Sequence, residues 1–171
     1  MVRDAVVGDE FQIAAVHVAA WRGGYAGLMP ADYLAGLSVE AGAERWRGSL
    51  AEPVTGTQCL VAEEGGQVLG VTTFGVSRDD DASPTTGELW AINLAPASWG
   101  CGVGTALLTA AVDRLTAAGF RHATLWVLDG NVRARHFYDR RGWKPDGATK
   151  VDERTGFALH EVRYARSLPP G

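Results

Sequence analysis

Cysteine is scarce in this chain of 171 residues, which contains only Cys59 and Cys101. Two isolated cysteines provide neither a disulfide framework nor the ligand spacing of a zinc site, and we expect no bound metal. An excess of basic residues is also missing. The net charge of −4 argues against a general nucleic-acid binder, although residues 133–144 form a local basic patch.

Long apolar runs are absent as well. No stretch approaches the roughly 18 apolar residues of a membrane-spanning helix. Residues 1–9 carry charges at Arg3 and Asp4 and lack the apolar core of a signal peptide. We therefore expect a cytoplasmic protein that does not associate with membranes. A chain of this length fits a single domain, residues 1–171, whose buried core needs no disulfide or metal to stabilise it.

The spacing of apolar residues changes several times along the chain. Helical spacing follows Asp9, the expected N-cap, and should stop at Gly23-Gly24, while Glu64-Gly65-Gly66 predicts a tight hairpin. Further helices are predicted at 30–34, 43–50, 102–118 and 131–140, and strands at 2–7, 58–63, 67–76, 88–94, 123–128, 149–152 and 157–167. This order predicts an α/β (α+β) fold with a mixed, mostly antiparallel sheet of about seven strands and helices on both faces.

The sharpest local signal is the run Gly100-Cys101-Gly102-Val103-Gly104, which lies between an expected strand and an expected helix. Glycines let the backbone turn tightly, and the first turn of a helix leaves N–H groups unpaired. Together these features form a cradle for an anion such as a pyrophosphate. The run lacks the lysine of a P-loop, and Thr105 stands where a dinucleotide fingerprint needs glycine or alanine. A merely flexible connection stays open as an alternative.

With Trp99 before it, this turn resembles the phosphate motif Arg/Gln-x-x-Gly-x-Gly/Ala of the GCN5-related N-acetyltransferase (GNAT) superfamily. Trp99 departs from the usual Arg or Gln, which removes a supporting side chain and leaves the backbone cradle. A second family motif agrees, and consists of a strand followed by Asn131, Ala134, Phe137-Tyr138 and Gly142-Trp143. The resemblance covers nearly the whole chain.

The resemblance implies an acetyl-CoA-dependent N-acetyltransferase in which the parallel strands 88–94 and 123–128 splay apart around acetyl-CoA. The acetyl group would pass directly to a primary amine of a small molecule or a protein N-terminus. The N–H of Leu94 would face the thioester carbonyl, and a β-bulge common in this strand of the family is not visible in the sequence. The implied cofactor-binding residues are Ile92, Asn93, Leu94, Trp99, Gly100, Cys101, Gly102, Val103, Gly104, Thr105, Asn131, Ala134 and Tyr138.

Two residues are candidates for the proton transfers of this reaction. Tyr138 matches the family tyrosine that is proposed to protonate the CoA sulfur, with core packing beside Phe137 as the alternative. Glu88 is the candidate base, acting directly or through water, because it lies on the strand that leads to the acetyl site. A solvated position at the strand start is the alternative for Glu88. Asn131 could bind pantetheine or cap the following helix.

The acceptor is not identified by the sequence. Trp21, Tyr25 and Trp90 are candidates for lining its pocket, and core packing is the competing interpretation of each. His17 is expected to be structural. A non-catalytic acyl-CoA-binding sensor domain remains the alternative function, although the retained Tyr138 favours catalysis. A homodimer is left open.

Overall fold

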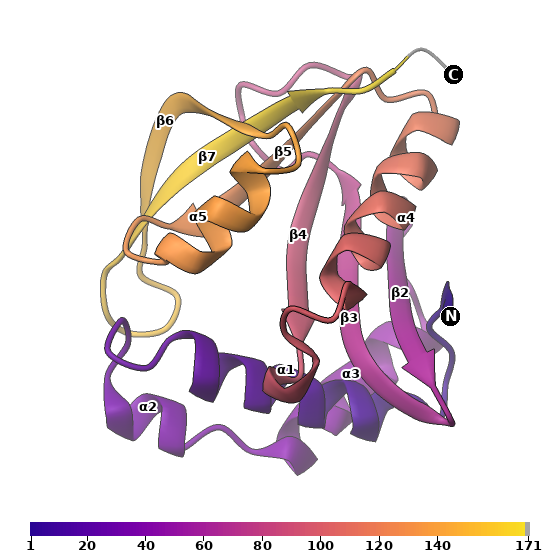
Figure 1. Cartoon of the computed structure of the whole chain (residues 1–171), viewed down its shortest axis with the longest axis vertical. Coiled ribbons are helices and arrows are strands. Elements are labelled where there is room, and N and C mark those ends of the chain that lie inside the picture. Colours follow the sequence, from indigo (N-terminus) through magenta and orange to yellow (C-terminus); the bar gives the residue numbers. More distant parts are fainter. Residues whose placement is uncertain (170–171) are drawn as a thin grey trace.

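Seven strands form one sheet in the order β1-β2-β3-β4-β5-β7-β6 (Figure 1). The computed structural model describes residues 1–169, so residues 170–171 of the predicted domain lie outside the described part. All neighbouring strands of this sheet are antiparallel except β4 and β5, which confirms the predicted mixed sheet. The strands are Val2–Asp4 (β1), Thr57–Glu64 (β2), Gln67–Val76 (β3), Thr86–Leu94 (β4), His122–Leu128 (β5), Lys144–Asp152 (β6) and Leu159–Ser167 (β7).

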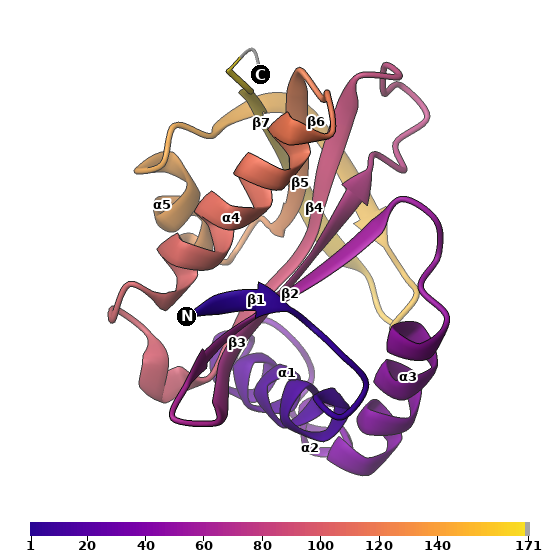
Figure 2. The same cartoon turned by 90° about the vertical axis from the view of Figure 1, so that its right-hand side faces the viewer.

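Helices cover both faces of the sheet, as predicted. They are Glu10–Gly24 (α1), Ala31–Ala35 (α2), Val39–Ala51 (α3), Val103–Ala117 (α4) and Val132–Asp139 (α5), with a short 3₁₀ turn at Pro96–Ser98 (η1). Figure 2 shows α4 and α5 on one face and α1 and α3 on the other. No helix among residues 1–169 has both the length and the apolar character needed to cross a membrane.

Each helical layer buries an apolar stripe against the sheet. On the α4 side, Leu107 and Leu115 pack with Phe74 and Leu125, and all four side chains are buried. On the opposite side, Ile13 and Val16 of α1 pack against β2 and β3. Burying one such side chain contributes about 1.5–3 kcal/mol, so these two cores fix the sheet against its helices.

The central pair β4–β5 is joined over a short stretch only. Residues Thr86–Leu89 of β4 pair with His122–Leu125 of β5, and beyond Leu89 the two strands diverge (Figure 1). β5 stays paired with β7 along its length, and β4 stays paired with β3 up to Leu94. One edge of β4 is therefore free just before the glycine-rich turn.

β4 contains a β-bulge at Trp90. Thr73 of β3 pairs with Ala91 and Phe74 pairs with Leu89, so Trp90 is the extra residue. Gly75 makes room for its ring, because a Cβ atom at Gly75 would lie 2.8 Å from Trp90 Cη2. A bulge bends its strand and increases the local twist, so it turns the end of β4 away from β5.

The first strand and the cap of α1 differ from the prediction. β1 ends at Asp4, because the chain turns over residues 6–9, where the Asp9 carboxylate accepts the Val6 N–H at 2.9 Å. The same carboxylate accepts two bonds from the Arg3 guanidinium, at 2.7 and 2.9 Å. Asp9 occupies the N-cap position but makes no side-chain cap bond to α1, so the predicted capping role was wrong.

α1 ends at Gly24 with Tyr25 as its C-cap, which confirms the predicted end of the helix at Gly23-Gly24. Gly23 also serves close packing, because a Cβ atom there would lie 3.0 Å from Trp99 Cη2 and 3.1 Å from Pro96 Cγ. Glycine at this position is therefore required by neighbours distant in sequence as well as by the helix end. The last hairpin is also longer than predicted, since β6 begins at Lys144 and its pairing with β7 shifts register between Pro145 and Thr149.

Candidate active site

A cleft of about 660 Å³ lies at the divergence of β4 and β5. It brings together most residues that the sequence pointed to, from α1, β4, the glycine-rich turn and α5. Of the predicted residues, the cleft is lined by Trp21, Tyr25, Trp90, Ile92, Asn93, Leu94, Trp99, Gly100, Gly102, Gly104, Thr105, Asn131, Ala134 and Tyr138. Glu88, Cys101 and Val103 are not among the lining residues.

The glycine-rich turn has the geometry of an anion cradle. Gly100 and Gly102 have φ angles of 77° and 85°, which side chains rarely tolerate. Gly102 is the N-cap of α4 and leaves the helix without a side-chain cap. A Cβ atom at Gly100 or Gly102 would meet nothing within 4 Å, so the turn faces open space. The N–H groups of the first turn of α4 are thus available to an anionic group, where the helix dipole also favours negative charge.

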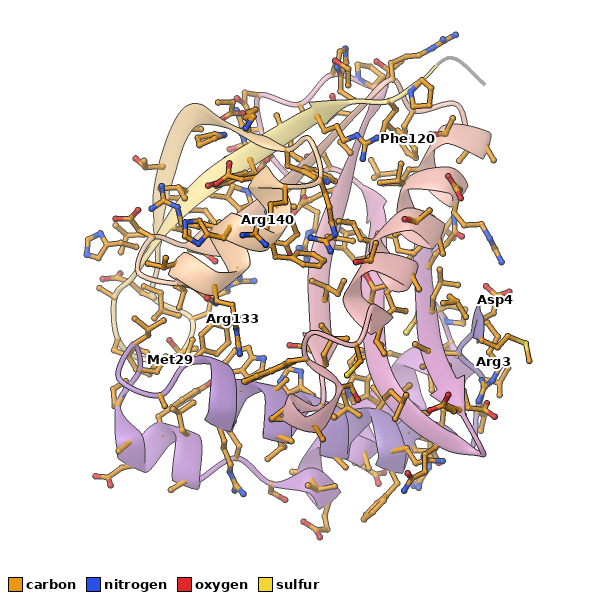
Figure 3. The ribbon with its side chains drawn as sticks, viewed as in Figure 1. Arg3, Asp4, Met29, Phe120, Arg133 and Arg140 are labelled. Carbon is orange, nitrogen blue, oxygen red and sulfur yellow. The ribbon has the colours of Figure 1, made fainter. Side chains whose placement is uncertain are left out.

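Trp99 anchors this turn in place of the usual Arg or Gln. Its indole Nε1–H donates to the Leu94 carbonyl at 3.1 Å, which ties the turn to the end of β4. Arg133 of α5 lies on the other side of the cleft and covers the indole, with its Cζ 3.3 Å from the ring centroid. Figure 3 shows Arg133 extending from α5 toward α1. A positive charge therefore stands beside the cradle although residue 99 carries none.

A second arginine lies at the same end of the cleft. Arg141 donates to the Phe137 carbonyl at 2.8 Å and to the Thr105 hydroxyl, and its Cζ is 3.9 Å from the Phe137 ring centroid. Both arginines line the cleft, and the family motifs did not predict either. The basic patch at residues 133–144 was the signal in the sequence that could have found them.

Tyr138 is 7% exposed and lines the cleft from α5. Phe137 and Trp143 pack against it at ring-centroid distances of 5.2 and 6.2 Å. Burial, and to a smaller extent nearby Tyr25, raises the pKa of the Tyr138 hydroxyl, because an apolar environment disfavours the phenolate. Tyr138 therefore keeps its proton at neutral pH and can donate it into the cleft.

Asn131 is the N-cap of α5. Its Oδ1 accepts the Ala134 N–H at 3.1 Å, which confirms the capping interpretation. Because its amide also lines the cleft, the predicted contact with pantetheine stays a prediction.

The opposite end of the cleft is aromatic. Trp21 and Tyr25 of α1 pack edge to face at 5.1 Å, and His17 stacks on Trp21 at 4.9 Å. Burial lowers the pKa of His17 to about 4, so this histidine is neutral at physiological pH. Trp90 and Trp126 line the cleft from β4 and β5. This end suits the apolar part of a small molecule, and Trp126 was not predicted.

Two carboxylates that the sequence did not single out, Asp152 and Glu161, also line this end. Asp152 holds Arg154 through bonds of 2.9 Å to Nε and 2.6 Å to Nη2. That pairing, with the Arg154 guanidinium as the largest cause, lowers the pKa of Asp152 to about 2. Burial acts on Glu161 in the opposite direction and raises the pKa of its carboxyl.

Glu88 lies where the sheet is still closed. It pairs with Thr124 of β5, and its side chain is buried. Its carboxylate accepts the Arg78 backbone N–H at 2.8 Å and an Arg78 guanidinium N–H at 3.3 Å. The structure thus places the predicted base beside the cleft and not on its wall.

Splayed parallel strands, a glycine-rich turn at a helix N-terminus and a buried tyrosine together define an acyltransferase of the GNAT type. The family model described as "Acetyltransferase (GNAT) family" matches residues 16–143. The chain belongs to this family and is an acyltransferase.

Relatives and solved structures agree with this assignment. The chain is 34% identical to the "Uncharacterized N-acetyltransferase YuaI" of Bacillus subtilis over 76% of this chain and 72% of that protein. It is 31% identical to the "Probable N-acetyltransferase Rv2775" of Mycobacterium tuberculosis, over 99% and 96% of the two chains. The PaiA N-acetyltransferase of Thermoplasma acidophilum, solved in complex with coenzyme A, has a TM-score of 0.79 at 17% identity, covering 98% of each chain. That likeness shows the fold.

Proposed function

We propose that this protein is an acetyl-CoA-dependent N-acetyltransferase that passes the acetyl group directly to a primary amine. The observation that carries the proposal is one continuous cleft with an anion cradle at one end, a protonated buried tyrosine on its wall and an aromatic pocket at the other end. The arrangement fits a long ligand that is anionic at one end, and a solved structure of similar fold contains coenzyme A.

The residues present fit such a ligand. The open cradle at Gly100 and Gly102, with Arg133 and Arg141 nearby, suits a pyrophosphate. The free edge of β4 at Ile92–Leu94 offers backbone groups to the pantetheine amides, as an added strand would. In this proposal the Leu94 N–H faces the thioester carbonyl, where negative charge grows during attack.

Tyr138 acts as the general acid in this proposal and gives its phenolic proton to the departing sulfur. An alkylammonium has an ordinary pKa of about 10.4, so a base must remove a proton before the nitrogen can attack. Glu88 remains a candidate for this base, acting through water, because Arg78 holds its carboxylate beside the cleft.

The test is thiol release from acetyl-CoA in the presence of a broad panel of primary amines. We expect release that depends on the amine and a product that carries one acetyl group. Coenzyme A binding without turnover across the panel would favour a non-catalytic acyl-CoA sensor and would overturn the proposed activity.

A further inference from the structure

Glu161 of β7 is the one cleft carboxylate, among the described residues, that no guanidinium or backbone N–H holds. The cleft is lined by two carboxylates, and Asp152 is occupied by Arg154. Glu161 Oε2 is buried, and Lys150 Nζ approaches it in an ion pair of 3.5 Å. A buried carboxylate held by one contact of this length can accept a further hydrogen bond from a ligand.

The strand pairing places Glu161 on the aromatic side of the cleft. It pairs with Leu128 of β5, and Trp126 lies two residues earlier on the same face. Tyr25 of α1 approaches closely enough that the Glu161 charge helps to raise the pKa of the tyrosine hydroxyl. Aromatic faces and a carboxylate together are the groups that recognise an organic cation.

The ammonium group of Lys150 lies beside Glu161 and Trp126 in the structure. Lys150 Nζ forms an ion pair with Glu161 Oε2 at 3.5 Å and lies 4.2 Å from the Trp126 ring centroid. An ammonium thus already sits between this carboxylate and an aromatic face, and the Lys150 side chain is only partly buried there.

We propose that the Glu161 carboxylate binds the ammonium group of the acceptor and accepts its proton, so that the acceptor is a primary alkylamine with an apolar body. This inference rests on the proposed function. The apolar body would lie against Trp21, Tyr25 and Trp90, which line the same end of the cleft. Burial raises the pKa of the Glu161 carboxyl. The difference between this pKa and that of the ammonium is therefore smaller, which favours proton transfer from the ammonium to Glu161.

The proton balance needs no further reactant. An alkylammonium loses two N–H protons on becoming an amide, and the first passes to Glu161 and then to solvent. The freed lone pair attacks the thioester carbon, and the C–S bond breaks with its electron pair on sulfur. Tyr138 gives that sulfur a proton, and the second N–H proton restores Tyr138 through solvent.

The first test is Glu161→Gln, which keeps the shape and removes the charge. We expect kcat/KM for the amine to fall about 100-fold or more, with the dissociation constant of coenzyme A changed less than about 2-fold. Glu153→Gln is the matched control, because Glu153 is exposed in the loop between β6 and β7 and does not line the cleft. Measuring kcat/KM for the amine in Glu88→Gln as well shows which of the two candidate bases, Glu88 or Glu161, the reaction depends on.

The pH profile gives a readout that a structural role would not change. The groups that face Glu161 are Tyr25 of α1, Lys150 and Asp152 of β6, and Arg154 of the following loop. We expect kcat/KM for the amine to fall on the acid side as Glu161 becomes protonated, and Glu161→Gln to lose this limb. An unchanged acid limb in the variant would overturn the inference.

Binding to the wild-type protein provides a test that does not depend on turnover. The fluorescence of the cleft tryptophans reports binding of 2-phenylethylamine and of its uncharged counterpart 2-phenylethanol. We expect the amine to bind about 10-fold more tightly at neutral pH, and this preference to vanish in Glu161→Gln. Equal binding of amine and alcohol by the wild-type protein would contradict the inference.

The outcomes distinguish this inference from the proposed function. If the wild-type protein releases no thiol with any amine, the proposed function fails, whatever the variant does. If the wild-type protein is active and Glu161→Gln keeps its kcat/KM for the amine, the acetyltransferase activity stands and only the role of Glu161 is wrong.

Discussion

Arg133 and Trp99 meet across the mouth of the cleft, with the arginine Cζ 3.3 Å from the indole ring centroid. They come from α5 and from the turn before α4, so the contact joins the two motifs on which the family resemblance rests. Gly24 of α1 lies beside this pair, and a Cβ atom there would be in ordinary contact with Arg133 Nη2 at 3.6 Å. The indole thereby keeps a guanidinium beside the glycine-rich turn.

The first prediction concerns this guanidinium. Arg133→Gln should weaken coenzyme A binding about 10-fold, equivalent to about 1.4 kcal/mol, by removing a charge beside the pyrophosphate. Binding by the wild-type protein should also weaken as salt is added, and the variant should show a smaller salt dependence. Calorimetric titration at two salt concentrations measures both effects. Arg140→Gln is the control, because Arg140 is exposed at the end of the same helix and does not line the cleft. Equal losses in the two variants would contradict a local role.

The second prediction concerns the glycine-rich turn. Gly102→Glu should abolish coenzyme A binding, because a side chain and a negative charge would enter the cradle. Gly119→Glu is a close control at the other end of α4: both glycines have positive φ, and an added Cβ meets nothing within 4 Å at either. Thermal melting should show similar destabilisation of the two variants, whereas only Gly102→Glu should lose the ligand. Retention of wild-type affinity in Gly102→Glu would refute this cofactor site.

The third prediction concerns Tyr138. Tyr138→Phe should lower kcat about 100-fold, the lower end of the usual range for general-acid catalysis, because a thiolate is a good leaving group. The KM for acetyl-CoA should stay within a few fold, since the ring and its packing remain. Tyr164→Phe is the control variant, because Tyr164 is also buried but does not line the cleft. Its hydroxyl accepts a hydrogen bond from Arg135 Nε at 3.3 Å. A folded Tyr138→Phe protein with wild-type kcat would make the tyrosine structural.

The fourth prediction concerns stability and pH at the N-terminus. The bonds from Arg3 hold the pKa of Asp9 below its ordinary value of 3.8, so the folded state favours the charged carboxylate. The resulting stabilisation is present above pH 3.8 and is lost as the pH falls through the lowered pKa. Asp9→Asn should therefore lower the free energy of unfolding at neutral pH by roughly 1.5–3 kcal/mol.

Urea denaturation measures this difference, which should shrink as the solution is acidified below pH 3.8. Asp4→Asn is the control, because the Asp4 ion pair with Arg114 is exposed and should contribute less than about 1 kcal/mol. If the loss of unfolding free energy in Asp9→Asn did not change on acidification, the Arg3–Asp9 ion pair would not be its cause.

The glycine-rich end of the cleft could be predicted from the sequence because its signals are local. The turn at Gly100–Gly104 and the segment from Asn131 to Tyr138 each depend on residues a few positions apart. Helix and strand positions followed from spacing in the same way, and the hairpin at Gly65-Gly66 was confirmed.

The aromatic end of the cleft could be predicted only in part, through Trp21, Tyr25 and Trp90, because its other residues are brought together by long-range pairing. Glu161 meets Trp126 and Lys150 only once β7 lies between β5 and β6, a strand order that no local pattern specifies. The bulge at Trp90 depends in turn on the register of β3. The close contact of Gly23 with Trp99 likewise joins residues that are far apart in the sequence.

The short pairing of β4 with β5 has a consequence for how the chain assembles. Every strand on the β4 side of the gap comes from residues 2–94 and every strand on the β5 side from 122–167, with α4 as the sequence link between them. Each half can thus pair its own strands without strands of the other half, before the halves meet at Thr86–Leu89. The cleft opens at the seam between these two halves of the sheet, so ligand binding there should slow hydrogen exchange across the seam more than inside either half.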